Sequence, residues 1–244
     1  MNSNLGSNPT RAPSPVSGVE YALETHQLSR SFDLGERKVR ALEDINFRVQ
    51  SGESVAIMGP SGGGKSTLLA LLGGLDTPSS GQVLIAGQDL YTISEFERVQ
   101  LRRGYLGYIF QGYDLLPALS VLENVEYPLL VAGLEPAKRR KMALAILTEV
   151  GLEGKEQFLP DELSGGQQQR VGIARCLVSE PRVVLADEPT GNLDTTTTNS
   201  ILELLRQATL ERGMTLVMVT HDPEVASRAD RIVRLRDGRI EVAS

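Results

Sequence analysis

Four short apolar runs lie along the chain, and each ends in a polar residue or a turn. They lie in Ser54–Met58, Tyr105–Phe110, Arg182–Glu188 and Met214–Thr220. Each run is short and apolar on both faces, a pattern typical of strands that are buried in a parallel sheet. The pattern therefore predicts an α/β core.

Other segments predict strands and a helix nearer the surface. Tyr21–Thr25 and Ala41–Val49 alternate between apolar and polar residues, which favours strands with one face in water. His26 follows the first of these and is interpreted as a structural residue at a strand end. Gly81–Gly87 predicts a further short strand, and Ser94–Arg103 a surface helix.

Helical periodicity fills most of the chain after residue 112. Ser120 and Glu123 form a possible capping box for a helix that Pro128 should interrupt. Pro136 opens another helix, which Gly151 ends. The expected buried faces are Met142, Ala145, Ile146 and Val150 in that helix, then Val171, Ala174, Leu177 and Val178, and finally Ile201, Leu204, Leu205 and Ala208.

These elements suggest how the chain is divided. Residues 112–165 are expected to be a helical subdomain inserted between two parts of the α/β core, 19–111 and 166–244. Residues 1–18 are rich in Asn, Ser, Pro and Gly and lack an apolar h-region, so we expect a disordered tail and no signal peptide. The protein is accordingly expected to stay in the cytoplasm.

Composition narrows the possible functions. The 244 residues carry a net charge of −6, which gives no support to nucleic-acid binding. No apolar run approaches the ~20 residues that span a bilayer, so the chain is not itself a channel or permease. Its single cysteine, Cys176, excludes an internal disulfide, fits a reducing compartment and is expected to pack in the core.

The strongest chemical signal lies between the first buried strand and an apolar helix. It reads Gly59-Pro60-Ser61-Gly62-Gly63-Gly64-Lys65-Ser66-Thr67 and matches G-x-x-x-x-G-K-[ST] in the strand–loop–helix context that the motif requires. Glycines allow backbone N–H groups to converge on phosphate oxygens at a helix N-terminus. Lys65 supplies a cation for the β- and γ-phosphates, and Ser66 a hydroxyl suited to Mg²⁺. The sequence therefore predicts a nucleoside triphosphate site.

Polar residues end the other buried strands, where ligands bind in open α/β sheets. Gln111 is weak evidence by itself, because any strand must end in something polar. Asp187 and Glu188 are adjacent and should face opposite ways, so Asp187 is predicted to hold Mg²⁺ opposite Ser66. Glu188 is predicted to be the general base toward the attacking water. His221 is predicted to donate a hydrogen bond to a phosphate oxygen.

Three features each admit two interpretations. Leu163-Ser164-Gly165-Gly166-Gln167 opens a helix that either binds a second anion or is simply capped by Ser164, and local physics favours capping. Phe32 either packs in the core, which the sequence alone favours, or stacks on a nucleobase. The basic run Lys138–Lys141 is either a solvated helix face, the favoured interpretation, or a contact with a membrane surface.

Together these motifs resemble those of the ATP-binding subunits of ABC transporters, from about Tyr21 to the C-terminus. The resemblance rests on GPSGGGKST at 59–67, Gln111, LSGGQ at 163–167, VVLADE at 183–188 and His221, in that order. It implies a P-loop ATPase core with an inserted helical subdomain and an N-terminal antiparallel β region. ATP is then the nucleotide, and Phe32 the residue that stacks on adenine.

The resemblance also implies a homodimer in which ATP lies between the phosphate loop of one chain and LSGGQ of the other. It assigns Ser164, Gly165, Gly166 and Gln167 to nucleotide contact, and Gln111 to sensing Mg²⁺ and the attacking water. Asn192-Leu193-Asp194 matches the loop that communicates across the dimer. Two departures, Gly63 for the more frequent serine and Phe32 for the commoner tyrosine, are expected to leave binding intact.

A narrower likeness points to the group that contains MacB, LolD, FtsE and antimicrobial-peptide-detoxification ATPases. It is carried by 72–76, 108–111, 114–117, 123–125, 185–194 and 220–223. It implies a membrane partner with few spans and a large extracytoplasmic domain, contacted through Gly112–Val131. It also implies a peripheral position on the cytoplasmic side of the inner membrane, in export or lipoprotein release.

Two rival functions follow from the same motifs. One is a regulator, FtsE-like or peptide-sensing, that uses the ATPase without moving cargo. The other is an ABC ATPase of DNA repair or translation, which is disfavoured because the chain has one compact cassette and no long coiled-coil insert. No nucleic-acid partner is therefore expected.

Overall fold

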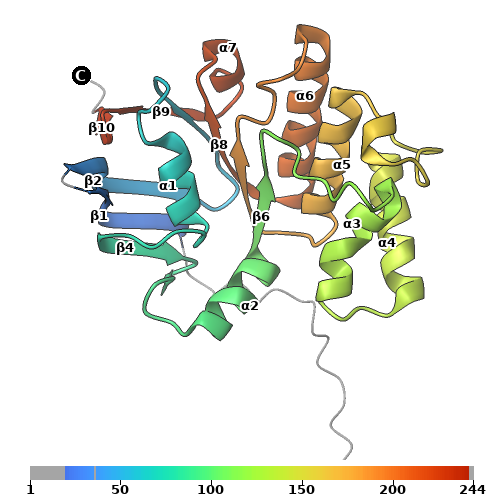
Figure 1. Ribbon diagram of the computed structural model, residues 1–244, viewed down its shortest axis with the longest axis horizontal. Helices are drawn as coiled ribbons and strands as arrows, with labels where there is room; N and C mark the ends of the chain where they lie inside the picture. The colour runs from blue at the N-terminus through green and yellow to red at the C-terminus, as the bar shows by residue number, and fades with distance from the viewer. Residues whose placement is uncertain (1–19, 36, 242–244) are drawn as a thin grey trace, which may run out of the picture.

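The computed structural model of the chain describes residues 20–35 and 37–241, so the predicted tail at 1–18 lies outside it. Figure 1 shows an antiparallel sheet on one side, a second sheet through the middle, and a group of helices on the other side. The mixed α/β architecture with an antiparallel β region near the N-terminus is confirmed.

The central sheet has six strands in the order β10-β9-β3-β8-β7-β6. Its parallel part contains the four predicted buried strands, and β9 continues it while β10 is antiparallel at the edge. The strands are β3 (Ser54–Met58), β6 (Leu106–Ile109), β7 (Val183–Asp187), β8 (Thr215–Thr220), β9 (Arg231–Arg236) and β10 (Arg239–Glu241).

Alternate residues of β7 and β8 enter two different hydrophobic clusters. Val183, Leu185, Val217 and Val219 pack with α1 (Lys65–Leu72) and the antiparallel sheet. The residues between them, such as Val184 and Met218, pack with helices of the opposite face. Because both faces are covered, these strands read as uninterrupted apolar runs.

The antiparallel sheet has the order β2-β1-β4-β5. Its strands are β1 (Tyr21–Leu34), β2 (Arg37–Gln50), β4 (Ser80–Ile85) and β5 (Gln88–Asp89). The first two are longer than predicted, because register shifts carry β1 past its polar residues. Gln27, at one of these shifts, has a φ of 50°. His26 therefore lies inside β1, and its predicted place at a strand end is wrong.

Most remaining helices share the hydrophobic cluster on the other face of the central sheet. They are α3 (Val121–Val131), α4 (Pro136–Glu149), the 3-10 turn η1 (Pro160–Glu162), α5 (Gly165–Leu177), α6 (Thr195–Arg212) and the short α7 (Pro223–Ala226). Of these, α3 and α4 pack on α5 and on each other. Ser120 and Glu123 form the predicted capping box, and the buried faces predicted for α5 and α6 are confirmed. Cys176 is buried as expected, and burial raises the pKa of its thiol to about 12.

Two helical predictions are wrong. Pro128 lies inside α3 and does not end it; burial of Val125 and Leu129 on either side outweighs the lost backbone hydrogen bond. In α4, Ala145 is exposed, and the buried positions are Ala143, Ile146, Leu147 and the capping residue Val150. The basic run of α4 is exposed except for Arg139, which pairs with Glu126 at 3.5 Å.

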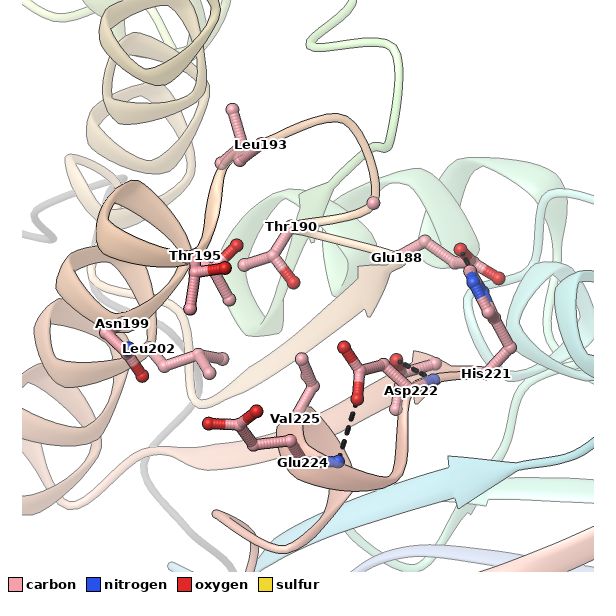
Figure 2. A pocket seen from close by; sticks show the side chains of 13 residues that line it. Glu188, Thr190, Leu193, Thr195, Asn199, Leu202, His221, Asp222, Glu224 and Val225 are labelled. Carbon is pink, nitrogen blue, oxygen red and sulfur yellow. Dashed lines mark hydrogen bonds and ion pairs between the residues drawn. The ribbon is translucent and has the colours of Figure 1, made fainter.

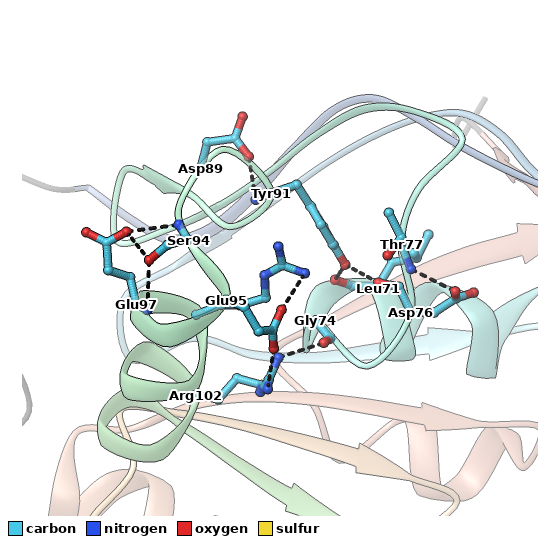
Figure 3. A network of polar contacts seen from close by, with 11 residues as sticks. Leu71, Gly74, Asp76, Thr77, Asp89, Tyr91, Ser94, Glu95, Glu97 and Arg102 are labelled. Atoms are coloured by element: carbon cyan, nitrogen blue, oxygen red, sulfur yellow. Dashed lines mark hydrogen bonds and ion pairs between the residues drawn. The ribbon is translucent and has the colours of Figure 1, made fainter.

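A polar network holds the C-terminal end of α1 against the segment around α2 (Glu95–Tyr105), as Figure 3 shows. The Tyr91 hydroxyl lies 2.7 Å from the carbonyl of Leu71 and 2.6 Å from that of Asp76. Arg102 donates to the carbonyl of Gly74 at 2.9 Å. The helix that follows the phosphate loop is thus fixed at its far end.

Gly73, which caps α1, makes room for a side chain of the central sheet. A Cβ at this position would lie 1.4 Å from the Tyr108 hydroxyl on β6. We expect Gly73→Ala to lower the free energy of unfolding by about 1–3 kcal/mol through overpacking, as measured by urea denaturation. In a Tyr108→Ala background the same change should cost much less; an equal cost in both backgrounds would contradict this account.

Candidate functional site

The predicted catalytic residues lie at one edge of the central sheet. β3, β8, β7 and β6 are successive parallel neighbours, so their carboxyl ends meet there. The phosphate loop follows β3, His221 follows β8, and Asp187 and Glu188 end or follow β7. Gln111 follows β6 after one residue, Phe110. The structure therefore brings together groups separated by up to 162 positions in the sequence.

The phosphate loop is shaped by glycines where a side chain would not fit. Gly64 caps α1 with a φ of 96°, and a Cβ there would lie 2.5 Å from the Ala41 carbonyl oxygen. Lys65 is buried, and its ammonium group donates to the carbonyl oxygens of Gly59 and Pro60, each at 2.9 Å. The Lys65 ammonium group is thereby held inside the phosphate loop. The loop ends at the N-terminus of α1, and a helix N-terminus favours a bound anion.

Ser66 and Asp187 face each other across this edge, as predicted for a shared metal ion. The Ser66 hydroxyl donates to Asp187 Oδ1 at 3.3 Å. Burial raises the pKa of the Asp187 carboxyl; the hydrogen bond from Ser66 opposes the rise, and the charge of Glu188 adds to it. A divalent cation would favour the ionised carboxylate here. The two oxygen donors fit Mg²⁺, which is usually held by one or two protein groups together with phosphates and water.

Glu188 and His221 form a pair that neither residue's local sequence reveals. His221 Nδ1 lies 2.8 Å from Glu188 Oε2, with the Glu188 side chain 16% exposed and the imidazole 59% exposed. Glu188 has a φ of 42°, a conformation that is uncommon outside glycine. A Cβ placed on Gly191 would lie 3.2 Å from Glu188 Oε2 and 3.1 Å from Gln111 Nε2, so both side chains reach the same small glycine.

A pocket of about 180 Å³ lies beside this pair. Figure 2 shows Glu188 and His221 side by side at one end and Asn199 and Leu202 at the other. The lining residues come from the connection after β7, from α6, and from the end of β8 and α7; none belongs to the phosphate loop. The pocket therefore adjoins the predicted catalytic pair and is separate from the phosphate loop.

The LSGGQ segment is not brought to the phosphate loop of its own chain. Ser164 caps α5, with its hydroxyl accepting from the Gln167 N–H at 3.4 Å, as local physics favours. Its contact with nucleotide, which the resemblance implies, stays a prediction. Cβ atoms on Gly165 and Gly166 would approach Tyr113 and Thr197. Among the described residues, no hydrogen bond joins 163–167 to 59–67, and α1 and α5 lie on opposite sides of β6 in Figure 1.

Asp194 is likewise engaged within its own chain. Its carboxylate caps α6, accepting from the Thr197 N–H at 3.0 Å and from the Thr197 hydroxyl at 2.6 Å. These hydrogen bonds lower the pKa of the Asp194 carboxyl. Its predicted role across a dimer stays a prediction.

Phe32 is half-buried and belongs to neither hydrophobic cluster, so core packing is wrong for this residue. The Arg30 guanidinium lies 4.5 Å from the centre of its ring. Arg30 is in turn held by Asp76 through two hydrogen bonds of 2.7 and 2.8 Å. The Arg30 cation, itself held by Asp76, therefore fixes the position of the Phe32 ring from one face.

Two side chains, Arg30 and Arg175, were missed by the sequence reasoning, and so was the contact that Asn192 makes within its own chain. Arg30 is two residues before Phe32 on one strand, and the period of two was a signal that both share a face. Asn192 donates to the carbonyl of Gln111 at 3.3 Å, and Arg175 donates to the carbonyls of Tyr113 and Asp114. The contacts of Asn192 and Arg175 join residues 61 to 81 positions apart, so no local sequence pattern predicts them.

Comparisons with known proteins agree with this geometry. A family model described as "ABC transporter" matches residues 42–191. The chain is 47% identical over 218 residues to the lipoprotein-releasing system ATP-binding protein LolD of Syntrophotalea carbinolica, covering 89% of this chain and 96% of that one. It is also 47% identical over 218 residues to the macrolide export ATP-binding/permease protein MacB of Shigella flexneri, covering 89% of this chain and 34% of MacB.

A solved structure has the same fold. The dimeric, post-hydrolysis ATP-binding cassette MJ0796 bound to ADP and Pi superimposes with a TM-score of 0.85 at 41% identity, covering 90% of this chain and 97% of that one. In the described part of this chain, no helix combines the length and apolarity needed to cross a membrane. The matches to LolD and MacB confirm the narrower likeness.

Proposed function

This chain belongs to the ABC transporter family as an ATP-binding and ATP-hydrolysing subunit, and on that premise we propose that its dimer drives a membrane partner of the MacB or LolD type. Export of a substrate or release of a lipoprotein is the proposed outcome. The observation that carries this proposal is the match to LolD over 96% of that protein's length, together with the catalytic groups gathered at the sheet edge.

In the proposed reaction, ATP is held by residues 59–67, with Phe32 stacked on the adenine. Glu188 accepts a proton from a water molecule as the water oxygen bonds to the γ-phosphorus. The bond to the bridging oxygen of ADP breaks, which releases ADP and inorganic phosphate. His221, 2.8 Å from Glu188, orients that carboxylate and is proposed to donate a hydrogen bond to a phosphate oxygen.

Ser66, Asp187 and Gln111 are the residues that would hold Mg²⁺. When bound, the ion neutralises charge on the β- and γ-phosphates. Asp187 is suited to this position because the carboxylate is partly buried and already accepts a hydrogen bond from Ser66.

The second half of each site is proposed to come from another copy of the chain. Ser164, Gly165, Gly166 and Gln167 are at the start of α5, away from the phosphate loop of the same chain. The first-turn N–H groups of a helix favour a phosphate. A head-to-tail dimer, with Asp194 near the shared boundary, would supply them.

The partner is proposed to dock in an apolar groove between β6 and α3. The groove has a volume of about 440 Å³ and includes Phe110, Leu116, Tyr127 and Val131 among its lining residues. Tyr127 and Val131 are 44% and 48% exposed. The fully buried Asn124 fixes the backbone of Leu116 at the edge of this groove. Its side-chain oxygen accepts from the Leu116 N–H at 2.8 Å, and its amide nitrogen donates to the Leu116 carbonyl. Leu116, Tyr127 and Val131 belong to the predicted contact segment 112–131, and β6 and α5 supply other parts of the lining.

The proposal predicts capture of one class of membrane protein. Affinity-tagged Glu188→Gln chain, purified with ATP from membranes in mild detergent, should retain a protein with few spans and a large extracytoplasmic domain, identified by mass spectrometry. Tyr127→Glu, which places a charge in the groove, should abolish capture while leaving basal ATP hydrolysis intact. A permease with many spans would overturn the MacB/LolD-type partner, and copurified ribosome or DNA would overturn membrane transport.

A further inference from the structure

Arg175 makes a connection that the proposed reaction leaves unexplained. It lies three turns along α5 and is partly buried. Its guanidinium donates to the carbonyl oxygen of Asp114 at 2.6 Å and to that of Tyr113 at 2.9 Å. A desolvated cation needs such acceptors; burial lowers the pKa of this guanidinium, and Asp114 opposes the shift.

The loop that Arg175 holds is conformationally costly. Tyr113 and Asp114 have φ values of 63° and 48°, and both are non-glycine residues. A left-handed conformation is unfavourable for such residues and persists only where surrounding contacts enforce it. Inside the loop, the Asp114 N–H donates to the carbonyl oxygen of Gly112 at 2.7 Å. The Tyr113 N–H donates to the carbonyl oxygen of Phe110 at 3.3 Å. Gln111 lies within this same turn.

The loop also contacts the beginning of α5. A Cβ on Gly165 would lie 2.9 Å from the Tyr113 hydroxyl, and a Cβ on Gly172 would lie 3.5 Å from the Tyr113 carbonyl oxygen. Tyr113 therefore lies along α5 from its first turn to Arg175, and Gln111 is two residues before it in the same turn. Ser164, which caps that first turn, is at one end of this contact.

We propose that Arg175 is a positioning residue that locks the loop of Gln111 onto α5, so that Gln111 and the Ser164 end of the helix move as one body. This inference rests on the proposed role of Gln111 in ATP hydrolysis. Arg175 has no contact with the phosphate loop in the described residues. It also lines the groove proposed for the membrane partner, together with Asp114. A partner in that groove would act directly on this unit.

The test compares Arg175→Met and Arg175→Lys with Arg206→Met. Arg206 is an exposed arginine of α6 and pairs with Glu203 of its own helix. Backbone amide exchange at Tyr113 and Asp114 should be roughly tenfold faster or more in Arg175→Met, as expected when hydrogen bonds to a charged group are lost. Turnover of ATP should fall by a similar factor, while the Kd for ATP stays within about twofold. Arg206→Met should change none of these.

Two further variants separate this inference from the proposed function. Adding Arg175→Met to Gln111→Ala should cause little further loss of turnover, because both act on one step. Normal turnover in Gln111→Ala alone would remove the role of Gln111, while amide exchange would still decide whether Arg175 holds the loop. Unchanged exchange in Arg175→Met, or additive losses, would overturn the proposal. If Arg175→Met does not fold, Arg175→Lys, with intermediate exchange expected, is judged by the same criteria.

Discussion

Replacement of Glu188 by glutamine is expected to lower ATP turnover by about 10²-fold or more, while ATP still binds. The amide has nearly the same shape, so it can occupy the place beside His221, but it cannot accept the proton from the attacking water. Phosphate release measured under saturating ATP, with ATP affinity measured by calorimetry, tests both halves of this expectation.

A matched control for this variant is Glu224→Gln. Glu224 lines the same pocket as Glu188 and His221 but is at the start of α7, away from the pair. Its amide variant should hydrolyse ATP at the normal rate. Turnover that is unchanged in Glu188→Gln, or reduced equally in both variants, would remove Glu188 from the role of general base.

Lys65→Ala is expected to weaken ATP binding itself, by about tenfold or more, because charged hydrogen bonds to the phosphates are lost. The buried ammonium group also holds the carbonyls of Gly59 and Pro60, so its removal loosens the cradle as well. Calorimetric titration with ATP measures the effect, and the melting temperature reports whether the chain remains folded.

The control for Lys65→Ala is Lys138→Ala, which removes an exposed lysine of α4. Both variants change the net charge equally, so a non-specific electrostatic effect on a polyanion would appear in both. An ATP affinity that is unaltered in Lys65→Ala would contradict the assignment of the loop to phosphate binding.

The sequence predicted well which polar residues meet at one edge of the central sheet, because the signals for them are local. Buried parallel strands appear as short apolar runs, and the side chains that end them are collected at one edge by the topology of the sheet. Thus Asp187, Glu188 and His221 could be grouped before any coordinates were known. Asp187, the last residue of β7, meets Ser66 as predicted. The pairing of Glu188 with His221 was not predicted, because Glu188 follows the strand with a φ of 42°.

Features that depend on distant contacts could not be predicted in this way. Pro128 stays within α3 because the apolar residues around it are buried by other elements. β1 continues past its polar residues because bulges restore pairing with β2 and β4. The support of Phe32 by Arg30 and Asp76, and of the Gln111 loop by Arg175, joins segments that are far apart in the chain.

In the proposed dimer, ATP is shared between the phosphate loop of one chain and the start of α5 in a second copy. Light scattering after size-exclusion chromatography of Glu188→Gln tests this arrangement most directly. With ATP and Mg²⁺ the variant should have twice the mass of a single chain, and addition of Ser164→Arg should return it to a monomer that still binds ATP. A Glu188→Gln chain that stays monomeric with ATP, or a dimer that persists with Ser164→Arg, would contradict the account.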